Sequence, residues 1–161
     1  MSNDNYPINV GDPAPDFTLR SHNGREIKLS TLKGKVVVLY FYPKDFTSGC
    51  TREACDFRDN YSPLKAGGAV VLGVSPDSAD SHTKFADKYS LPFILLTDPE
   101  HKVMNAYGAW GVKKRFGKET EGVKRSTVII DSKGIVRKIW KTVRVDGHVE
   151  KVLAEVKKLQ N

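Results

Sequence analysis

Two cysteines, Cys50 and Cys55, are the side chains of this 161-residue sequence best suited to covalent chemistry. Cys50 follows Thr47-Ser48-Gly49 at the expected start of a helix, where backbone N–H groups are unpaired and the macrodipole is positive. Both features favour the thiolate, which can attack a small electrophile in a partly enclosed pocket. A buried and inert Cys50 that only fills space is an equally good interpretation of this position alone.

Cys55 lies five residues after Cys50 on the same expected helix. Residues at i and i+5 differ by about 140° and ~7.5 Å of rise, which places their Cα atoms roughly 8–9 Å apart. A disulfide generally needs less than about 7 Å, so the two sulfurs can bond only if the first helical turns unwind. The spacing therefore suits a gated redox pair better than a structural disulfide. Taken alone, Cys55 is more simply an incidental cysteine on the polar side of the helix.

Hydrophobic periodicity predicts the elements that position these cysteines. The unbroken apolar run Val36–Tyr42 indicates a central strand covered on both faces, and it ends shortly before Cys50. The other expected strands are Phe17–Leu19, Ile27–Leu29, Ala69–Val74, Phe93–Leu96, Thr127–Ile130 and Ile135–Trp140. The expected helices carry the apolar stripes Cys50-Ala54-Phe57-Tyr61-Leu64, His82-Phe85-Ala86-Tyr89 and Val149-Val152-Leu153-Val156-Leu159, and a short helix covers His101–Tyr107.

The order of these elements predicts an α/β fold with a single domain over residues 1–161. Alternating strands and helices favour a central mixed sheet flanked by helices, and the turn His22-Asn23-Gly24 makes the first two strands an N-terminal β-hairpin. Ligand sites in open sheets of this type lie beyond the carboxyl ends of the strands. The segment between Tyr42 and Cys50 is such a place.

Charge and hydropathy argue against several other partners. The net charge is +7, from 26 basic and 19 acidic residues, but only Lys113, Lys114, Arg115 and Lys118 form a local excess. We expect a solvated basic surface and no nucleic-acid partner, because no basic helix with interleaved aromatic residues is present. No apolar run reaches the eighteen residues or so of a membrane span, and residues 1–10 lack a secretory signal pattern. We therefore expect a cytoplasmic chain with no membrane partner.

The residues around Cys50 resemble the active-site motif of peroxiredoxins, Pro43-x-x-x-Thr47-x-x-Cys50. The longer stretch with Tyr42-Pro43-Lys44-Asp45, Gly49-Cys50-Thr51 and Glu53-Ala54-Cys55 is similar to the bacterioferritin comigratory protein, or peroxiredoxin Q, branch. Further matches in the family order are Ala14-Pro15-Asp16-Phe17, Tyr107-Gly108, Trp110-Gly111 and Lys124-Arg125-Ser126-Thr127. The resemblance spans nearly the whole chain and implies a thioredoxin-like fold.

The resemblance also implies a reaction cycle for the two cysteines. Cys50 would be the peroxidatic nucleophile that reduces hydrogen peroxide or an organic hydroperoxide and becomes a sulfenic acid. Cys55 would be the resolving cysteine that forms an intramolecular disulfide with Cys50, and thioredoxin would reduce this disulfide. We expect a monomer that needs no cofactor and no metal. The four histidines, which form no metal-ligand motif, are His22, His82, His101 and His148.

Four more residues take roles from the resemblance. Thr47 would offer its hydroxyl to peroxide and thiolate, and Pro43 would shield the thiolate from water. Arg125 would stabilise the thiolate and polarise the peroxide, with Glu53 holding the arginine side of the site. Such fixed groups act on the charge that develops on the departing oxygen. Each residue has a simpler alternative: a helix cap for Thr47, a strand end for Pro43, a surface charge for Arg125 and a dipole-complementing acid for Glu53.

Two residues depart from the pattern of this branch. Ser48 stands where proline is common, and it should loosen the loop or improve helix capping. Phe46 stands where a second aspartate is common, and it should put an aromatic ring near the mouth of the pocket.

Two competing functions remain open at this point. One is a disulfide exchanger of the thioredoxin fold, although these proteins usually carry Cys-x-x-Cys and four residues separate the cysteines here. The other is a nucleic-acid-binding or structural protein, which only the net charge suggests. Its binding would weaken steeply with salt and would survive the substitution Cys50→Ser.

Overall fold

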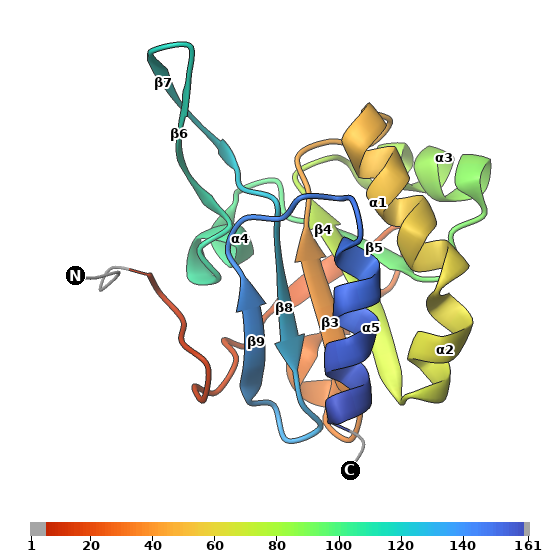
Figure 1. Cartoon of the computed structure of the whole chain (residues 1–161). Coiled ribbons are helices and arrows are strands. Elements are labelled where there is room, and N and C mark those ends of the chain that lie inside the picture. The colour runs from red at the N-terminus through yellow and green to blue at the C-terminus, as the bar shows by residue number, and fades with distance from the viewer. Residues whose placement is uncertain (1–5, 160–161) are drawn as a thin grey trace.

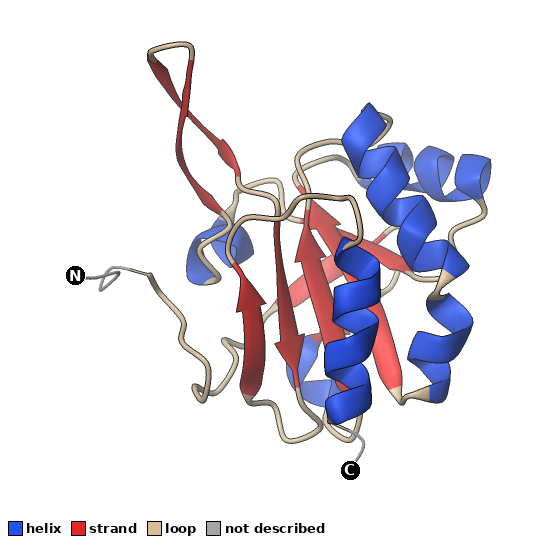
Figure 2. Ribbon diagram, viewed as in Figure 1, coloured by secondary structure: helices blue, strands red, loops and turns tan. Residues whose placement is uncertain are grey.

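The computed structural model describes residues 6–159, which form a seven-stranded sheet, a two-stranded sheet and several helices (Figures 1 and 2). The strands are β1 Thr18–Ser21, β2 Glu26–Lys28, β3 Val36–Phe41, β4 Ala69–Ser75, β5 Ile94–Thr97, β6 Trp110–Arg115, β7 Lys118–Val123, β8 Ser126–Ile130 and β9 Val136–Trp140. The helices are η1 Leu29–Leu32, α1 Ser48–Asp59, α2 Tyr61–Ala66, α3 Ala79–Tyr89, α4 Lys102–Ala106 and α5 His148–Lys158.

The large sheet is mixed, as predicted, and its strand order is β2-β1-β5-β4-β3-β8-β9. Strands β3, β4 and β5 are parallel, whereas β8 runs antiparallel to β3 and β9 antiparallel to β8. The expected N-terminal hairpin is confirmed, because β1 pairs antiparallel with β2 and joins the sheet through β5. The carboxyl ends of the three parallel strands meet at one edge, and the loop from Tyr42 to Thr47 leaves the sheet there.

Strand β3 is buried on both faces, which confirms the interpretation of its unbroken apolar run. Alternate residues point to opposite sides of the sheet. Val38 and Tyr40 belong to a core cluster that contains side chains of α1, α2, α3 and α5. Leu39 and Phe41 belong to a second cluster that contains side chains of η1 and α4. Helices therefore cover both faces of the strand that leads to Cys50.

The prediction of one continuous helix from Cys50 to Leu64 is wrong, because the chain forms two helices, α1 and α2, with a break at Asn60. Pro63 has no N–H to donate to the carbonyl of Asp59, and its ring crowds that carbonyl. Asn60 accordingly leaves the helical region, with φ −109° and ψ 11°. The apolar stripe survives the break, since both Phe57 and Leu64 are fully buried.

The hairpin β6–β7 was not predicted, and it projects away from the large sheet (Figure 1). Its segments are mostly polar and exposed, so they lack the apolar alternation by which strands are found in sequence. The available signal was the two-residue turn Phe116-Gly117, where both residues have positive φ angles of 54° and 77°. The local excess of basic residues lies on this hairpin.

The helices within residues 6–159 are too short or too polar to cross a membrane. Part of the segment in which we expected no secretory signal, residues 1–5, lies outside the described residues.

Candidate active site

Cys50 is the third residue of α1, and only 1% of it is exposed. Strand β3 ends at the edge of the sheet where the parallel strands have their carboxyl ends, and the loop after it leads into α1. Arg125 immediately precedes β8, whose first residue, Ser126, pairs with Phe41 at the end of β3. Antiparallel pairing therefore brings Arg125 beside the first turn of α1, although 75 residues separate it from Cys50 in the sequence.

Arg125 contacts both acidic groups of the site. Its Nη2 donates a hydrogen bond to Cys50 Sγ at 3.3 Å, and its Nη1 donates to Glu53 Oε1 at 2.6 Å. Burial opposes the charge of Arg125, but Glu53 and Cys50 outweigh it and raise the pKa of the guanidinium. A fixed positive charge at this distance stabilises a thiolate at Cys50 and negative charge on an oxygen next to it. The alternatives of a surface charge for Arg125 and a dipole-complementing acid for Glu53 do not fit this geometry, since Glu53 is buried and lies beyond the first turn of α1.

Gly49 is a site residue that sequence reasoning did not single out. A Cβ atom at this position would lie 3.2 Å from Arg125 Nη2, closer than ordinary van der Waals contacts. The missing side chain therefore lets the guanidinium approach the first turn of α1. Glycine is a poor helix former, so its place in a first turn was an available signal for such a close approach.

Thr47 and Pro43 line the loop before the helix. Thr47 occupies the N-cap position of α1, but its side chain makes no capping hydrogen bond. Its hydroxyl instead donates to the carbonyl of Lys44 at 2.8 Å, which leaves the oxygen lone pairs available to accept. Pro43 is half-buried two residues after the end of β3. The structure thus places both residues in the loop that leads to Cys50.

Cys55 is half-buried on the same unbroken helix as Cys50, and both cysteines are free. Burial raises the pKa of the Cys55 thiol, although Arg58 opposes this effect. Cys55 is therefore a weak nucleophile while α1 is intact, since the thiolate is the reactive form.

Phe46 and Ser48 lie on either side of Thr47, at the entrance to α1. Phe46 adopts a left-handed conformation with φ 67°, which aspartate tolerates better than a bulky residue does. Its half-exposed ring packs on Phe85 and Tyr89 of α3, with centroid distances of 5.2 and 6.4 Å. Ser48 is the first helical residue and follows the N-cap, so the expected improvement in capping is wrong. Proline would be preorganised at that position, which supports the expectation of a looser loop.

Glu53 is fully buried, and its Oε2 finds no hydrogen-bond partner within residues 6–159. Burial raises the pKa of Glu53 to about 7, and the adjacent Arg125 offsets part of this effect. Between about pH 4.5 and 7, Glu53 is therefore protonated in the folded protein but ionised in the unfolded chain. Glu53 therefore contributes stability that is complete below about pH 4.5 and is lost as the pH rises through about 7.

The substitution Glu53→Gln should remove this pH dependence. Between roughly pH 4 and pH 8, the wild type should lose about 3 kcal/mol more of its free energy of unfolding than the variant does. Urea unfolding of both proteins across this range measures the difference. A difference that stays constant or grows with pH would mean that Glu53 is ionised well below neutrality.

The comparisons with known proteins agree with this arrangement. Residues 10–139 match the model of the AhpC/TSA family. The chain is 51% identical to the peroxiredoxin Bcp of Bacillus subtilis over 93% of this chain and 96% of that one. It is 39% identical to the peroxiredoxin Bcp of Escherichia coli over 91% and 94%.

The chain is also similar to a solved structure of the Xanthomonas campestris bacterioferritin comigratory protein, from work on the alkyl peroxide reduction activity of that protein. The TM-score is 0.86 at 35% identity, with 90% of this chain and 92% of that chain covered. These findings confirm the thioredoxin-like fold and the resemblance drawn from the motif. The chain belongs to the AhpC/TSA family and, within it, to the Bcp, or peroxiredoxin Q, group of thiol-dependent peroxidases.

Proposed function

We propose that Cys50 carries the peroxidase activity as its nucleophile. The Cys50 thiolate attacks one oxygen of a hydroperoxide, the O–O bond breaks, and the departing oxygen takes a proton to leave as water or an alcohol. The sulfur is oxidised to a sulfenic acid by two electrons, and the peroxide is reduced by the same two. The single observation that carries this proposal is the Arg125 hydrogen bond to Cys50 Sγ, held in place by buried Glu53.

The other residues of the site act on the same step. Arg125 stabilises the thiolate and the charge on the departing oxygen. Thr47, whose hydroxyl hydrogen is donated to the Lys44 carbonyl, accepts a hydrogen bond from the O–H of the peroxide. Pro43 closes one wall and offers no N–H donor. Since Cys50 is 1% exposed, the proposed substrates are hydrogen peroxide and small organic hydroperoxides that can reach a buried sulfur.

Cys55 resolves the sulfenic acid in the second step. The helix α1 must first unwind at its start, because residues five apart on a helix are too distant to bond. Unwinding also exposes Cys55 to water and relieves the burial that raises its pKa. The Cys55 sulfur then bonds to the Cys50 sulfur, and the sulfenic oxygen leaves as water. An external dithiol, which we take to be thioredoxin, reduces the disulfide and is itself oxidised.

The proposal also covers localisation, oligomeric state, domain organisation and cofactors. We propose a cytoplasmic monomer with one domain over residues 1–161, which requires neither cofactor nor metal for this cycle.

The substitution Cys55→Ser tests the second step. The variant should reduce about one equivalent of peroxide at the wild-type rate, because Cys50 and its partners are unchanged. Turnover with thioredoxin should then fall to near background, since the sulfenic acid has no internal thiol with which to bond. A coupled thioredoxin assay measures turnover, and a small dithiol is the control, because it can reduce the sulfenic acid directly. Normal turnover of the variant with thioredoxin would show that Cys55 is not the resolving residue.

A further inference from the structure

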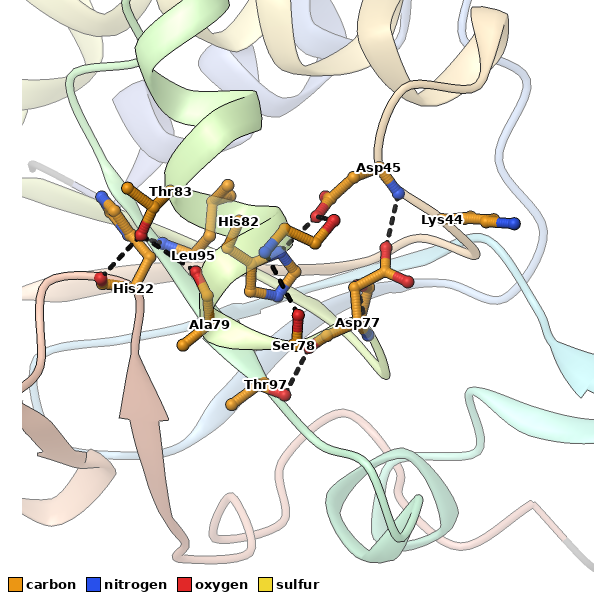
Figure 3. A network of polar contacts seen from close by, with 12 residues as sticks. His22, Lys44, Asp45, Asp77, Ser78, Ala79, His82, Thr83, Leu95 and Thr97 are labelled. Atoms are coloured by element: carbon orange, nitrogen blue, oxygen red, sulfur yellow. Dashed lines mark hydrogen bonds and ion pairs between the residues drawn. The ribbon is translucent and has the colours of Figure 1, made fainter.

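A second buried polar cluster lies between the loop that leads to Cys50 and the helix α3 (Figure 3). It joins Asp45 of the loop to Tyr42 and to His82 and Ser81 of α3. The side chains of Asp45 and His82 are 1% and 0% exposed. The proposed cycle uses neither of them, although Asp45 is only five residues before Cys50.

The hydrogen bonds of the cluster hold its buried side chains in one arrangement. His82 Nε2 lies 2.9 Å from the carbonyl oxygen of Leu96, which can only accept, so this nitrogen carries a proton. Asp45 accepts hydrogen bonds from the hydroxyls of Tyr42 and Ser81 at 2.6 and 2.8 Å. Burial alone would raise the pKa of the Asp45 carboxyl, but the hydrogen bonds to His82, Tyr42 and Ser81 lower it. His82 Nδ1 lies 2.7 Å from Asp45 Oδ2, so a hydrogen bond joins the two buried side chains.

Two further hydrogen bonds fasten this cluster and the loop to the rest of the protein. His82 is anchored to β5 through Leu96, and the backbone N–H of Asp45 donates to Asp77 Oδ2 at 2.6 Å (Figure 3). Asp45, Asp77 and His82 bring potential metal ligands within 4.8 Å of one another. A cation at that point would have to displace the bond between His82 and Asp45, so we assign the cluster a clamping role.

The residue next to the clamp is in a strained conformation. Phe46 has φ 67°, which is costly for a bulky side chain and persists only when its surroundings enforce it. The contacts that enforce it are the clamp at Asp45 and the packing of the Phe46 ring on α3. Opening the clamp would therefore let the loop relax and would favour unwinding of the start of α1.

We propose that His82 is a positioning residue for Cys50: its hydrogen bond with Asp45 clamps the loop in the conformation that attacks peroxide and must release before Cys55 reacts. The inference rests on the roles proposed above for Cys50 and Cys55. It predicts that a weaker clamp slows peroxide attack and speeds disulfide formation. The rate of peroxide attack should fall while the rate of disulfide formation rises. A purely structural role for His82 would lower stability without changing the two rates in opposite directions.

The test is the substitution His82→Gln, which keeps a hydrogen-bonding group but lacks the two ring nitrogens that contact Asp45 and the Leu96 carbonyl. The second-order rate of Cys50 oxidation by hydrogen peroxide should fall about tenfold or more, because a displacement of about 1 Å at a reacting group is costly. The fraction of Cys50 converted to sulfinic acid at high peroxide should fall too, since faster disulfide formation removes the sulfenic acid. Stopped-flow kinetics and mass spectrometry give the two values.

Thr83→Ala is the matched control. Thr83 neighbours His82 on α3, but its hydroxyl donates to the carbonyl of His22, away from the loop (Figure 3). This variant should keep the wild-type rate and the wild-type sulfinic fraction. Asp45→Asn should reproduce the effect of His82→Gln, and the double variant should add less than about twofold, because both substitutions open one clamp.

Ser81→Ala keeps the proposal testable if His82→Gln does not fold. It removes one hydrogen bond to Asp45 and leaves those from Tyr42 and His82, and both readouts should shift by about two- to threefold in the same directions. Wild-type rates and sulfinic fractions in His82→Gln, or in Ser81→Ala where the former does not fold, would overturn the clamp. So would equal losses of rate in His82→Gln and Thr83→Ala. A wild-type Cys50 that does not react with peroxide would overturn the proposed function, and the clamp with it.

Discussion

Replacing Cys50 with serine is expected to abolish peroxide reduction, with a loss on the order of 10³-fold or more in the rate of peroxide consumption. A serine hydroxyl is a far weaker nucleophile towards a peroxide oxygen than a cysteine sulfur. The substitution is nearly isosteric, and the serine oxygen can accept the hydrogen bond that Arg125 now donates to Sγ. The variant should therefore fold, which circular dichroism can verify, and a peroxide-consumption assay gives the rate.

The matched control is Cys55→Ser, which removes the other thiol but should keep the first reduction of peroxide. Full activity in the Cys50→Ser protein would remove Cys50 from the mechanism. Loss of the first reduction in the control alone would exchange the roles of the two cysteines.

Removing Arg125 is expected to have the next largest effect. Arg125→Ala should lower the second-order rate of Cys50 oxidation by about 10²- to 10³-fold, the range seen when one fixed donor to a developing negative charge is lost. Arg125→Lys should recover only part of the rate, because an ammonium cannot bond Cys50 Sγ and Glu53 Oε1 together in the planar geometry of a guanidinium. Stopped-flow measurement with one equivalent of hydrogen peroxide yields these rates.

Two controls separate this effect from a loss of stability. Arg137→Ala removes an arginine that pairs with Asp131 on the surface, and it should leave the rate unchanged. Arg125→Ala leaves Glu53 buried without its partner, so Arg125→Ala combined with Glu53→Gln should restore stability but not the rate. An unchanged rate in Arg125→Ala would exclude the guanidinium from the reaction.

The core of the fold was predictable because its signals are local. The run Val36–Tyr42 indicates β3 without any knowledge of its neighbours, and the stripe from Cys50 to Leu64 survives the helix break that Pro63 imposes. The position of Cys50 at a helix start was predictable for the same reason. The helix break was predictable too, because a proline such as Pro63 within a helical pattern is itself a local signal.

The contacts between distant segments were not predictable from these patterns. The hairpin β6–β7 carries polar residues on most of its length, so its strands show no buried face. Gly49 acquires its importance only when Arg125 lies against it. His82 appeared as one member of an apolar stripe, and its partner Asp45 is 37 residues away in the sequence. Arg125 itself was identified through resemblance to a family, because the spacing alone does not distinguish it from the other arginines.

The central claim is that Cys50 reacts first with peroxide and that Cys55 then bonds to it. Peptide mass mapping of the reduced protein after one equivalent of hydrogen peroxide tests this order directly. The account predicts, at early times, one added oxygen on the peptide that contains Cys50, followed by a Cys50–Cys55 disulfide that lacks two hydrogens relative to the thiols. An unmodified Cys50, or oxidation that begins at Cys55, would contradict it.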